Sequence, residues 1–88
     1  MNAAQYKEFL HGFDCVVCLK LLGKRNPIVQ THHVESIRDK DSDFAMAPLC
    51  VDHHSELHQL SRRGFARRHG LDDIDLLKLT IKALAEKL

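Results

Sequence analysis

The stretch Leu49-Cys50-Val51-Asp52-His53-His54-Ser55-Glu56-Leu57-His58 decides the expected fold, because it gathers three histidines and a cysteine at the start of an expected helix. His54 and His58 are four residues apart, so they lie on one helix face and their imidazoles can reach one metal ion. His53 lies about 100° around the helix from His54, because a helix has about 3.6 residues per turn. His53 is one turn from Cys50 and suits a second ion. The stretch therefore predicts two metal sites that share one helix.

The size and composition of the chain predict a single domain that covers residues 1–88. A chain of this length has a small hydrophobic core, and metal sites commonly stabilise such domains. Residues 1–10 lack the apolar run of a secretory leader, and no apolar run is long enough to span a membrane. We therefore expect a reducing, cytoplasmic setting, in which close cysteines bind metal rather than form disulfides.

The residues before residue 28 predict a helix and a first metal-binding pair. Asn2 is a candidate N-cap of a helix that ends near Leu10 and covers the core. Cys15 and Cys18 are expected in a tight turn, followed by a loop or hairpin turn at residues 20–26. Two thiolates two residues apart can bind one tetrahedral ion. The alternative is a redox pair, but that motif usually opens a helix in a βαβ unit, which the sequence does not show.

Two short strands are expected next. The β-branched run at residues 28–31 predicts the first, and the apolar run at residues 44–49 predicts the second, with Pro48 at an edge or a strand end. The charged residues 35–42 are expected to connect them. His32 and His33 follow the first run, and neighbouring strand residues point to opposite faces, so one can face a metal and the other a substrate. Two surface histidines are the alternative, which the second histidine cluster makes less favourable.

The helix that carries the histidines is expected to end near Leu60 or to continue through Gly64. Ser61 is a candidate N-cap, which predicts a break there and a new helix at residues 62–69, ended by Gly70. The new segment carries a local basic cluster, although the net charge of the chain is only +1. A local patch is a weaker indication of nucleic-acid binding than a high overall charge. The cluster consists of Arg62, Arg63, Arg67 and Arg68.

A last helix is expected to run from a cap at Asp72 or Asp73 to Leu88. Apolar residues recur in it at alternating spacings of three and four, which is the pattern of an amphipathic helix. We interpret this stripe as packing on the domain core, with dimerisation as the alternative. The stripe consists of Ile74, Leu77, Ile81, Leu84 and Leu88.

These motifs together resemble the HNH, or ββα-metal, endonuclease family over about residues 15–70. The motifs are C-x-x-C, a strand that ends in His-His, and P-L-C-x-x-H-H-x-x-x-H. The sequence looks closest to the small phage-associated branch with a zinc knuckle, which includes recombination-linked nucleases. The resemblance implies an α+β fold, with a ββα-metal core at about residues 28–60 and flanking N- and C-terminal helices, the latter at about residues 62–88. It also implies a phage or prophage origin and a bacterial host cytoplasm.

The resemblance assigns roles to individual residues. Structural zinc would be held by a Cys₃His set, in which a histidine replaces the usual second cysteine of the motif: Cys15, Cys18, Cys50 and His53. A catalytic divalent ion would be held by His32, His54 and His58. His33 would be the general base. The central Asn of the family is missing, and its region holds Asp43 or Ala45; the Asp43 carboxylate could orient the base.

The implied activity is the hydrolysis of DNA phosphodiester bonds by a metal-dependent endonuclease or nickase. A cation bound to the phosphate offsets its negative charge and stabilises the poor leaving group. A neutral imidazole takes a proton from the attacking water. Three imidazoles favour Zn²⁺, Mn²⁺ or Ni²⁺, with Mg²⁺ less well served. Arg62 could bind the scissile phosphate, and Arg63, Arg67 and Arg68 suit flanking phosphates, so weak sequence preference is expected.

Other functions compete with this one. The first alternative is a zinc-stabilised DNA-binding module that lacks catalysis, which the missing Asn favours. The second is a thiol redox protein. A homodimer, or a recombination or replication protein that delivers the nuclease to its target, are the further partners that we expect besides DNA.

Overall fold

Two short antiparallel strands lie at the centre of the structure, a computed structural model that describes residues 1–34 and 42–88. Strand β1 (Gln30–His33) pairs with strand β2 (Met46–Leu49), so that His33 lies opposite Met46. All four residues of β2 are buried. The first strand begins two residues later than expected because β2 offers a partner only to residues 30–33. Ile28 is therefore outside the sheet, and its side chain is exposed.

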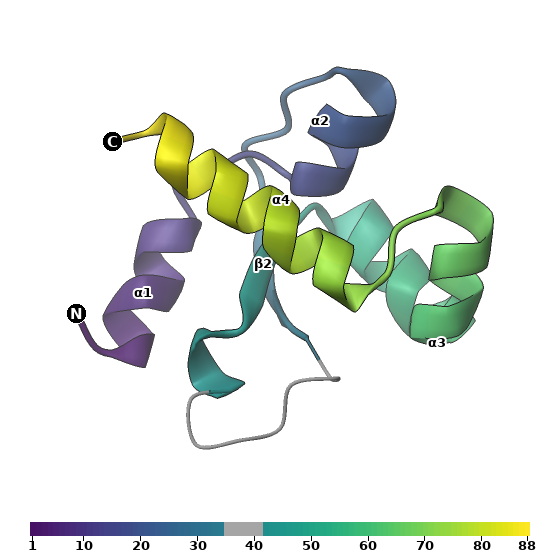
Figure 1. The fold of residues 1–88 in the computed structure, drawn as a ribbon, viewed down its shortest axis with the longest axis horizontal. Helices are drawn as coiled ribbons and strands as arrows, with labels where there is room; N and C mark the ends of the chain where they lie inside the picture. Colours follow the sequence, from purple (N-terminus) through teal and green to yellow (C-terminus); the bar gives the residue numbers. More distant parts are fainter. Residues whose placement is uncertain (35–41) are drawn as a thin grey trace.

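Helices surround this hairpin (Figure 1). Helix α4 (Asp73–Glu86) lies across β2, and α1 (Ala3–Leu10) and α2 (Val16–Leu22) also contact that strand. Helix α3 (Val51–His69) contacts β1. The described residues thus form a small α+β domain with four α-helices and a two-stranded sheet, and the expected order of strand, strand and helix at residues 28–60 is confirmed. Within the described ranges, no helix is both long and apolar enough to cross a membrane.

The core consists of two clusters of buried side chains. The larger joins α2, β2, α3 and α4, and its central side chains include Val17, Leu49, Phe65 and Leu76. The smaller one packs α1 against the start of β2 through Leu10 and its neighbours. Asn2 caps α1 as expected, because its side chain accepts a hydrogen bond from the backbone of Gln5.

Helix α2 replaces the tight turn and loop that the sequence predicted. Cys15 is its N-cap, and Gly23 ends it with φ of 62°, a left-handed conformation that glycine adopts without steric cost. The two β-branched residues Val16 and Val17 lower its intrinsic helix propensity. Both are buried, and α2 contacts β2 and α4, so tertiary packing rather than propensity stabilises this short helix.

The expected break at Ser61 is confirmed. Helix α3 continues from Val51 to His69, but Ser61 has φ of 64° and ψ of 168° and introduces a kink between two helical segments. Leu57 before the kink and Phe65 after it are both buried. Gly70 ends the helix in a left-handed conformation. The kink therefore lets both segments of one long helix pack on the same small core.

Helix α4 does not bury the stripe that the spacing indicated. Asp72 is the N-cap, and the buried residues are Asp73, Leu76 and Thr80. Ile74 and Ile81 are exposed, whereas Leu84 packs against the smaller cluster, so only part of the stripe packs on the core as expected. The Thr80 hydroxyl donates to the carbonyl of Leu76, which lets a polar side chain occupy the buried face that hydrophobic spacing alone would not assign to it.

The connection between the strands was expected at residues 35–42. Residues 35–41 lie outside the described part of the chain. Ser42 begins the short 3-10 helix η1 (Ser42–Phe44). Because Phe44 belongs to η1, the second strand begins at Met46 rather than at residue 44.

Candidate metal centres

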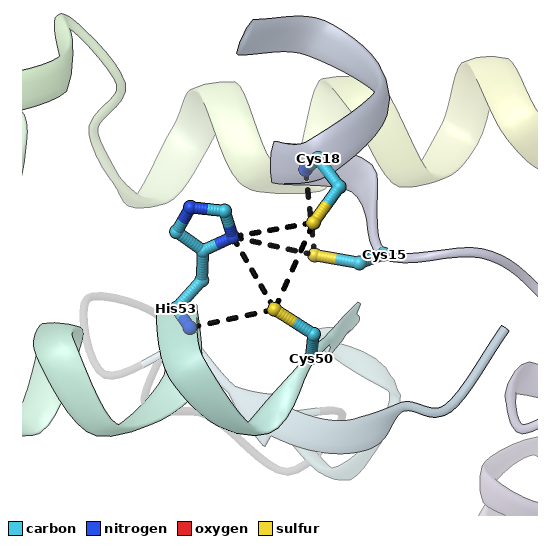
Figure 2. Close-up of side chains that lie close together, drawn as sticks. All are labelled: Cys15, Cys18, Cys50 and His53. Carbon is cyan, nitrogen blue, oxygen red and sulfur yellow. Dashed lines mark hydrogen bonds between the residues drawn. The ribbon is translucent and has the colours of Figure 1, made fainter. Parts of the chain in front are cut away.

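Two helix starts meet at the first candidate metal centre. Cys15 is the N-cap of α2 and Cys18 lies in its first turn, while Cys50 and His53 have the same two positions in α3. Each N-cap thiol accepts a hydrogen bond from the backbone amide three residues later, at 3.5 Å from Cys18 and 3.4 Å from His53. Figure 2 shows the four side chains converging from these two helices.

The distances within this cluster match the four corners of a tetrahedral zinc site. A Zn–S bond of about 2.3 Å and a Zn–N bond of about 2.0–2.1 Å place two sulfurs about 3.8 Å apart and a sulfur and a nitrogen about 3.6 Å apart. Nδ1 of His53 lies 3.3, 3.5 and 3.8 Å from the sulfurs of Cys50, Cys18 and Cys15. The sulfurs of Cys18 and Cys50 are 3.8 Å apart. The buried Cys₃His set can therefore hold a metal ion, and its ligand types suit zinc.

Burial makes this centre unfavourable for free thiolates. Desolvation raises the pKa of the Cys15 thiol and raises the pKa of the Cys18 thiol to about 12. Thiols with such pKa values stay protonated at neutral pH unless a cation stabilises the thiolate. A divalent ion supplies that stabilisation by displacing the protons. The raised pKa values of these thiols are therefore consistent with a centre that holds a metal ion.

The same geometry bears on the redox interpretation of Cys15 and Cys18. The structure contains all three cysteines as free thiols, with Cys50 as a third sulfur in the cluster. A redox pair needs two sulfurs and access to a partner thiol, whereas this centre has four converging ligands, and all three cysteines are buried. The arrangement favours metal binding.

Three histidines form the second candidate centre. His32 comes from β1 and is buried, and His54 and His58 come from α3. Their rings lie close together, with centroids 5.2 Å apart for His32 and His54 and 4.7 Å apart for His54 and His58. One nitrogen from each of the three lies within 4.8 Å of the others. The structure therefore brings together the three residues that the sequence assigned to the second ion.

The spacing of two of these nitrogens fits a shared ion. The Nε2 atoms of His54 and His58 are 3.1 Å apart, which matches two ligands at about 2.0–2.1 Å from one ion with an angle near 100° between them. Burial, and the nearby His58, lower the pKa of His54. A lowered pKa favours the neutral imidazole, which is the form that binds metal.

Gln30 fixes the orientation of one ligand. Its Oε1 lies 2.6 Å from Nδ1 of His54. Because an amide oxygen can only accept, Nδ1 of His54 is the donor and Nε2 keeps its lone pair toward the cluster. Gln30 and His32 are two residues apart on β1, so the same face of this strand supplies a ligand and the support for another.

The proposed base lies apart from the ligand face of β1. Neighbouring strand residues point to opposite faces, so His33 points away from the side that His32 occupies, and its side chain is exposed. Asp43 is exposed in η1. In the parts of the chain that the structure describes, no hydrogen bond joins Asp43 to His33. The orienting role expected for Asp43 therefore has no contact that supports it.

The four arginines follow the kink and differ in their surroundings. Nη1 of Arg62 lies 3.8 Å from Oδ2 of Asp73, and Nη1 of Arg68 lies 3.3 Å from Oε2 of Glu56. Arg63 and Arg67 are exposed. The kink separates Arg62 from the helix segment of His58, but both side chains line one cavity.

Two residues near the first centre were not expected from the sequence. Glu56 precedes the kink, and its carboxylate forms a hydrogen bond with Nε2 of His69 as well as the ion pair with Arg68, so it ties the two segments of α3 together. The ring of His69 in turn lies 6.0 Å from the ring of His53, centroid to centroid. The positions of Glu56 and His69 on a straight helix would not indicate this contact, because only the kink brings them together.

The chain matches no protein-family model, no curated protein and no solved structure. The functional conclusion therefore depends on the two clusters of side chains and their surroundings.

Proposed function

We propose that this chain is a metal-dependent DNA endonuclease or nickase of the HNH type, with little sequence preference. The observation that carries the proposal is the three-histidine cluster, which is separate from the Cys₃His cluster and borders a cavity with an arginine. A protein that needed metal only for folding would need one closed centre. A second set of three protein ligands, which leaves coordination positions open, is what a hydrolytic site requires.

The ligand types indicate which metal ion and which role belong to each centre. The Cys₃His set would hold structural zinc, and the three imidazoles would hold Zn²⁺, Mn²⁺ or Ni²⁺ in preference to Mg²⁺, which favours oxygen ligands. A divalent ion bound there would polarise the phosphate and stabilise the negative charge on the leaving oxygen. His32, His54 and His58 bind through neutral imidazoles, and Gln30 keeps His54 in the required tautomer.

In this proposal His33 accepts the proton of the attacking water. Its imidazole is exposed and directly follows the ligand His32 in the chain, but on the opposite face of β1, so the attacking water would have to lie at the edge of this strand to contact both the ion and His33. An imidazole can accept a proton near neutral pH, and general-base catalysis contributes about 10²–10⁴-fold to a rate. Arg62 would bind the scissile phosphate, while Arg63, Arg67 and Arg68 would bind neighbouring phosphates, which carry no sequence information.

A DNA-binding module without catalysis is the second candidate. It is favoured by the missing central Asn and by the lack of a described contact that orients His33. In such a module, the arginines after the kink would bind DNA and the Cys₃His centre would stabilise the fold. A replication or recombination protein, or a second copy that docks on α4, could bring either form to DNA.

The substitution His33→Ala separates the two candidates. Zinc-loaded wild type, His33→Ala and the control His11→Ala, an exposed histidine outside both clusters, are incubated with supercoiled plasmid and Mn²⁺, Mg²⁺ or Zn²⁺. We expect wild type and His11→Ala to nick the plasmid, and His33→Ala to be at least 100-fold slower with unchanged zinc content and DNA affinity. DNA binding without cleavage by wild type under any of these ions would support the binding module instead.

A further inference from the structure

A cavity of about 150 Å³ adjoins the three-histidine cluster. His32 and His58 line one part of it, and Arg62 and Asp73 line another. A water molecule occupies about 30 Å³ in the liquid, so the cavity has room for several waters or for one phosphate group. It therefore connects two metal-binding imidazoles with the Arg62 guanidinium and with a carboxylate that the sequence did not place in the site.

Asp73 is the unusual member of this lining. It is the first residue of α4, and its side chain is only 6% exposed. Its Oδ2 atom is buried and accepts no hydrogen bond from the described residues. A buried carboxylate oxygen without a hydrogen bond is costly. Two features offset that cost, namely the N-terminal end of α4, where the helix dipole favours negative charge, and the guanidinium of Arg62.

The Arg62 guanidinium is placed to bridge this carboxylate and a ligand. Its Nη1 atom is 3.8 Å from Oδ2 of Asp73, and the side chain is 47% exposed. A guanidinium has five N–H donors in a rigid fork, so one edge can face Asp73 while another faces an anion. Ser61, the residue of the kink, lines the same cavity. The kink residue and Asp73 thus line the cavity together with the guanidinium and His58.

We propose that Asp73 is a positioning residue, which holds the Arg62 guanidinium beside the three-histidine cluster so that it receives the scissile phosphate of DNA. This inference rests on the proposed nuclease function and adds to it a residue from α4. Asp73 is not among the side chains that lie within metal-ligand distance of one another, so it acts through Arg62. The carboxylate of Asp73 balances the charge of Arg62 before DNA binds. The phosphate then binds the N–H groups of the guanidinium that do not face Asp73.

A double-mutant cycle tests this role. Nicking rates are measured at several DNA concentrations for zinc-loaded wild type, Asp73→Asn, Arg62→Ala and the double variant. Gln59→Ala and Glu86→Gln are controls, because both side chains are exposed on the same two helices. We expect kcat to fall about 10-fold in Asp73→Asn and about 100-fold in Arg62→Ala, with the double variant no slower than Arg62→Ala alone. Zinc content and melting temperature should change little.

A spectroscopic measurement accompanies the cycle, because loss of activity alone does not show what Asp73 does. The guanidinium ¹⁵N resonances of Arg62, assigned by their absence from Arg62→Lys, should show slowed rotation in wild type and fast rotation in Asp73→Asn. Unchanged Arg62 signals in Asp73→Asn would overturn the role of Asp73, and so would kcat losses that multiply in the double variant. In either case, cleavage by wild type would still support the nuclease. A wild type that does not cleave at all would refute the nuclease and this role together.

Discussion

His53 and His54 are neighbours in the chain, but their imidazoles belong to different clusters. Nδ1 of His53 lies 3.3 Å from the sulfur of Cys50, whereas Nε2 of His54 lies 3.1 Å from Nε2 of His58. The angle of about 100° between successive residues of a helix accounts for this separation. One turn of α3 therefore carries ligands of both candidate metal centres, and it fixes the position of one centre relative to the other.

Loss of one cysteine of the first centre should unfold the domain. Structural zinc contributes about 10–16 kcal/mol of apparent binding free energy in zinc-finger peptides, and whole domains are stable by only about 5–15 kcal/mol. Cys15→Ser should therefore lose both its tightly bound zinc and its cooperative thermal transition. Circular dichroism and zinc analysis measure this, with His11→Ala as the control. A Cys15→Ser protein with the wild-type melting temperature would argue against a structural zinc centre.

Glu56 should stabilise the kinked helix in a pH-dependent manner. The hydrogen bond with His69, together with the charges of His69 and Arg68, holds the pKa of Glu56 below its ordinary value of 4.5. A carboxyl group with a lowered pKa in the folded protein contributes stability above its unfolded pKa, and that contribution disappears as the pH falls through the folded pKa. Because Glu56 is partly exposed, we expect Glu56→Gln to cost about 1.5 kcal/mol at pH 7, the low end for a charged hydrogen bond.

The measurement is the difference in melting temperature between wild type and Glu56→Gln as the pH is lowered from 7 to 3.5. This difference should shrink once the pH falls below about 4.5. Both proteins contain the same metal ligands and lose zinc over the same acidic range, so the difference between them carries the result. A gap that stayed constant to the lowest pH would mean that the charge of Glu56 does not stabilise the fold.

Replacing Ser61 with glycine should relieve backbone strain at the kink. Ser61 is the one non-glycine residue with positive φ in the described ranges, and its φ of 64° and ψ of 168° fall in a region that is almost restricted to glycine. Such strain costs about 1–3 kcal/mol, and the greater flexibility of glycine in the unfolded chain offsets about 0.5–1 kcal/mol of the gain. Ser61→Gly should thus be more stable by roughly 1 kcal/mol in chemical denaturation. A destabilised variant would indicate that the Ser61 side chain makes a needed contact.

Much of the fold could be predicted from local patterns. The Asn2 cap, the pair of strands and the break at Ser61 each have a short-range signal, namely a capping side chain, β-branched or apolar runs, and a serine within a helical segment. The two ligand sets likewise follow from angular positions on a helix and from alternation on a strand. Each of these features depends on a few residues that are close in the sequence, so it can be predicted from the sequence alone.

Other features depend on contacts between distant residues. Helix α2 forms because Val16 and Val17 are buried against β2 and α4, although their propensity is low. The exposure of Ile81 reflects the rotation of α4 on the core, and a sequence stripe does not determine that rotation. The Asp73–Arg62 pair needs both the kink and the return of α4 toward α3. Its sequence signal, an acidic residue at a helix start, indicated only a cap.

The most direct test of the two-centre account is the metal content and activity of His32→Ala/His54→Ala/His58→Ala. Native mass spectrometry at limiting zinc would count the bound ions, and plasmid nicking with Mn²⁺ would measure activity in the same samples. We predict that wild type and the triple variant each retain one tightly bound zinc ion and that only wild type nicks DNA. Loss of the tight zinc from the triple variant, or nicking by it, would contradict a separate hydrolytic centre built from these three histidines.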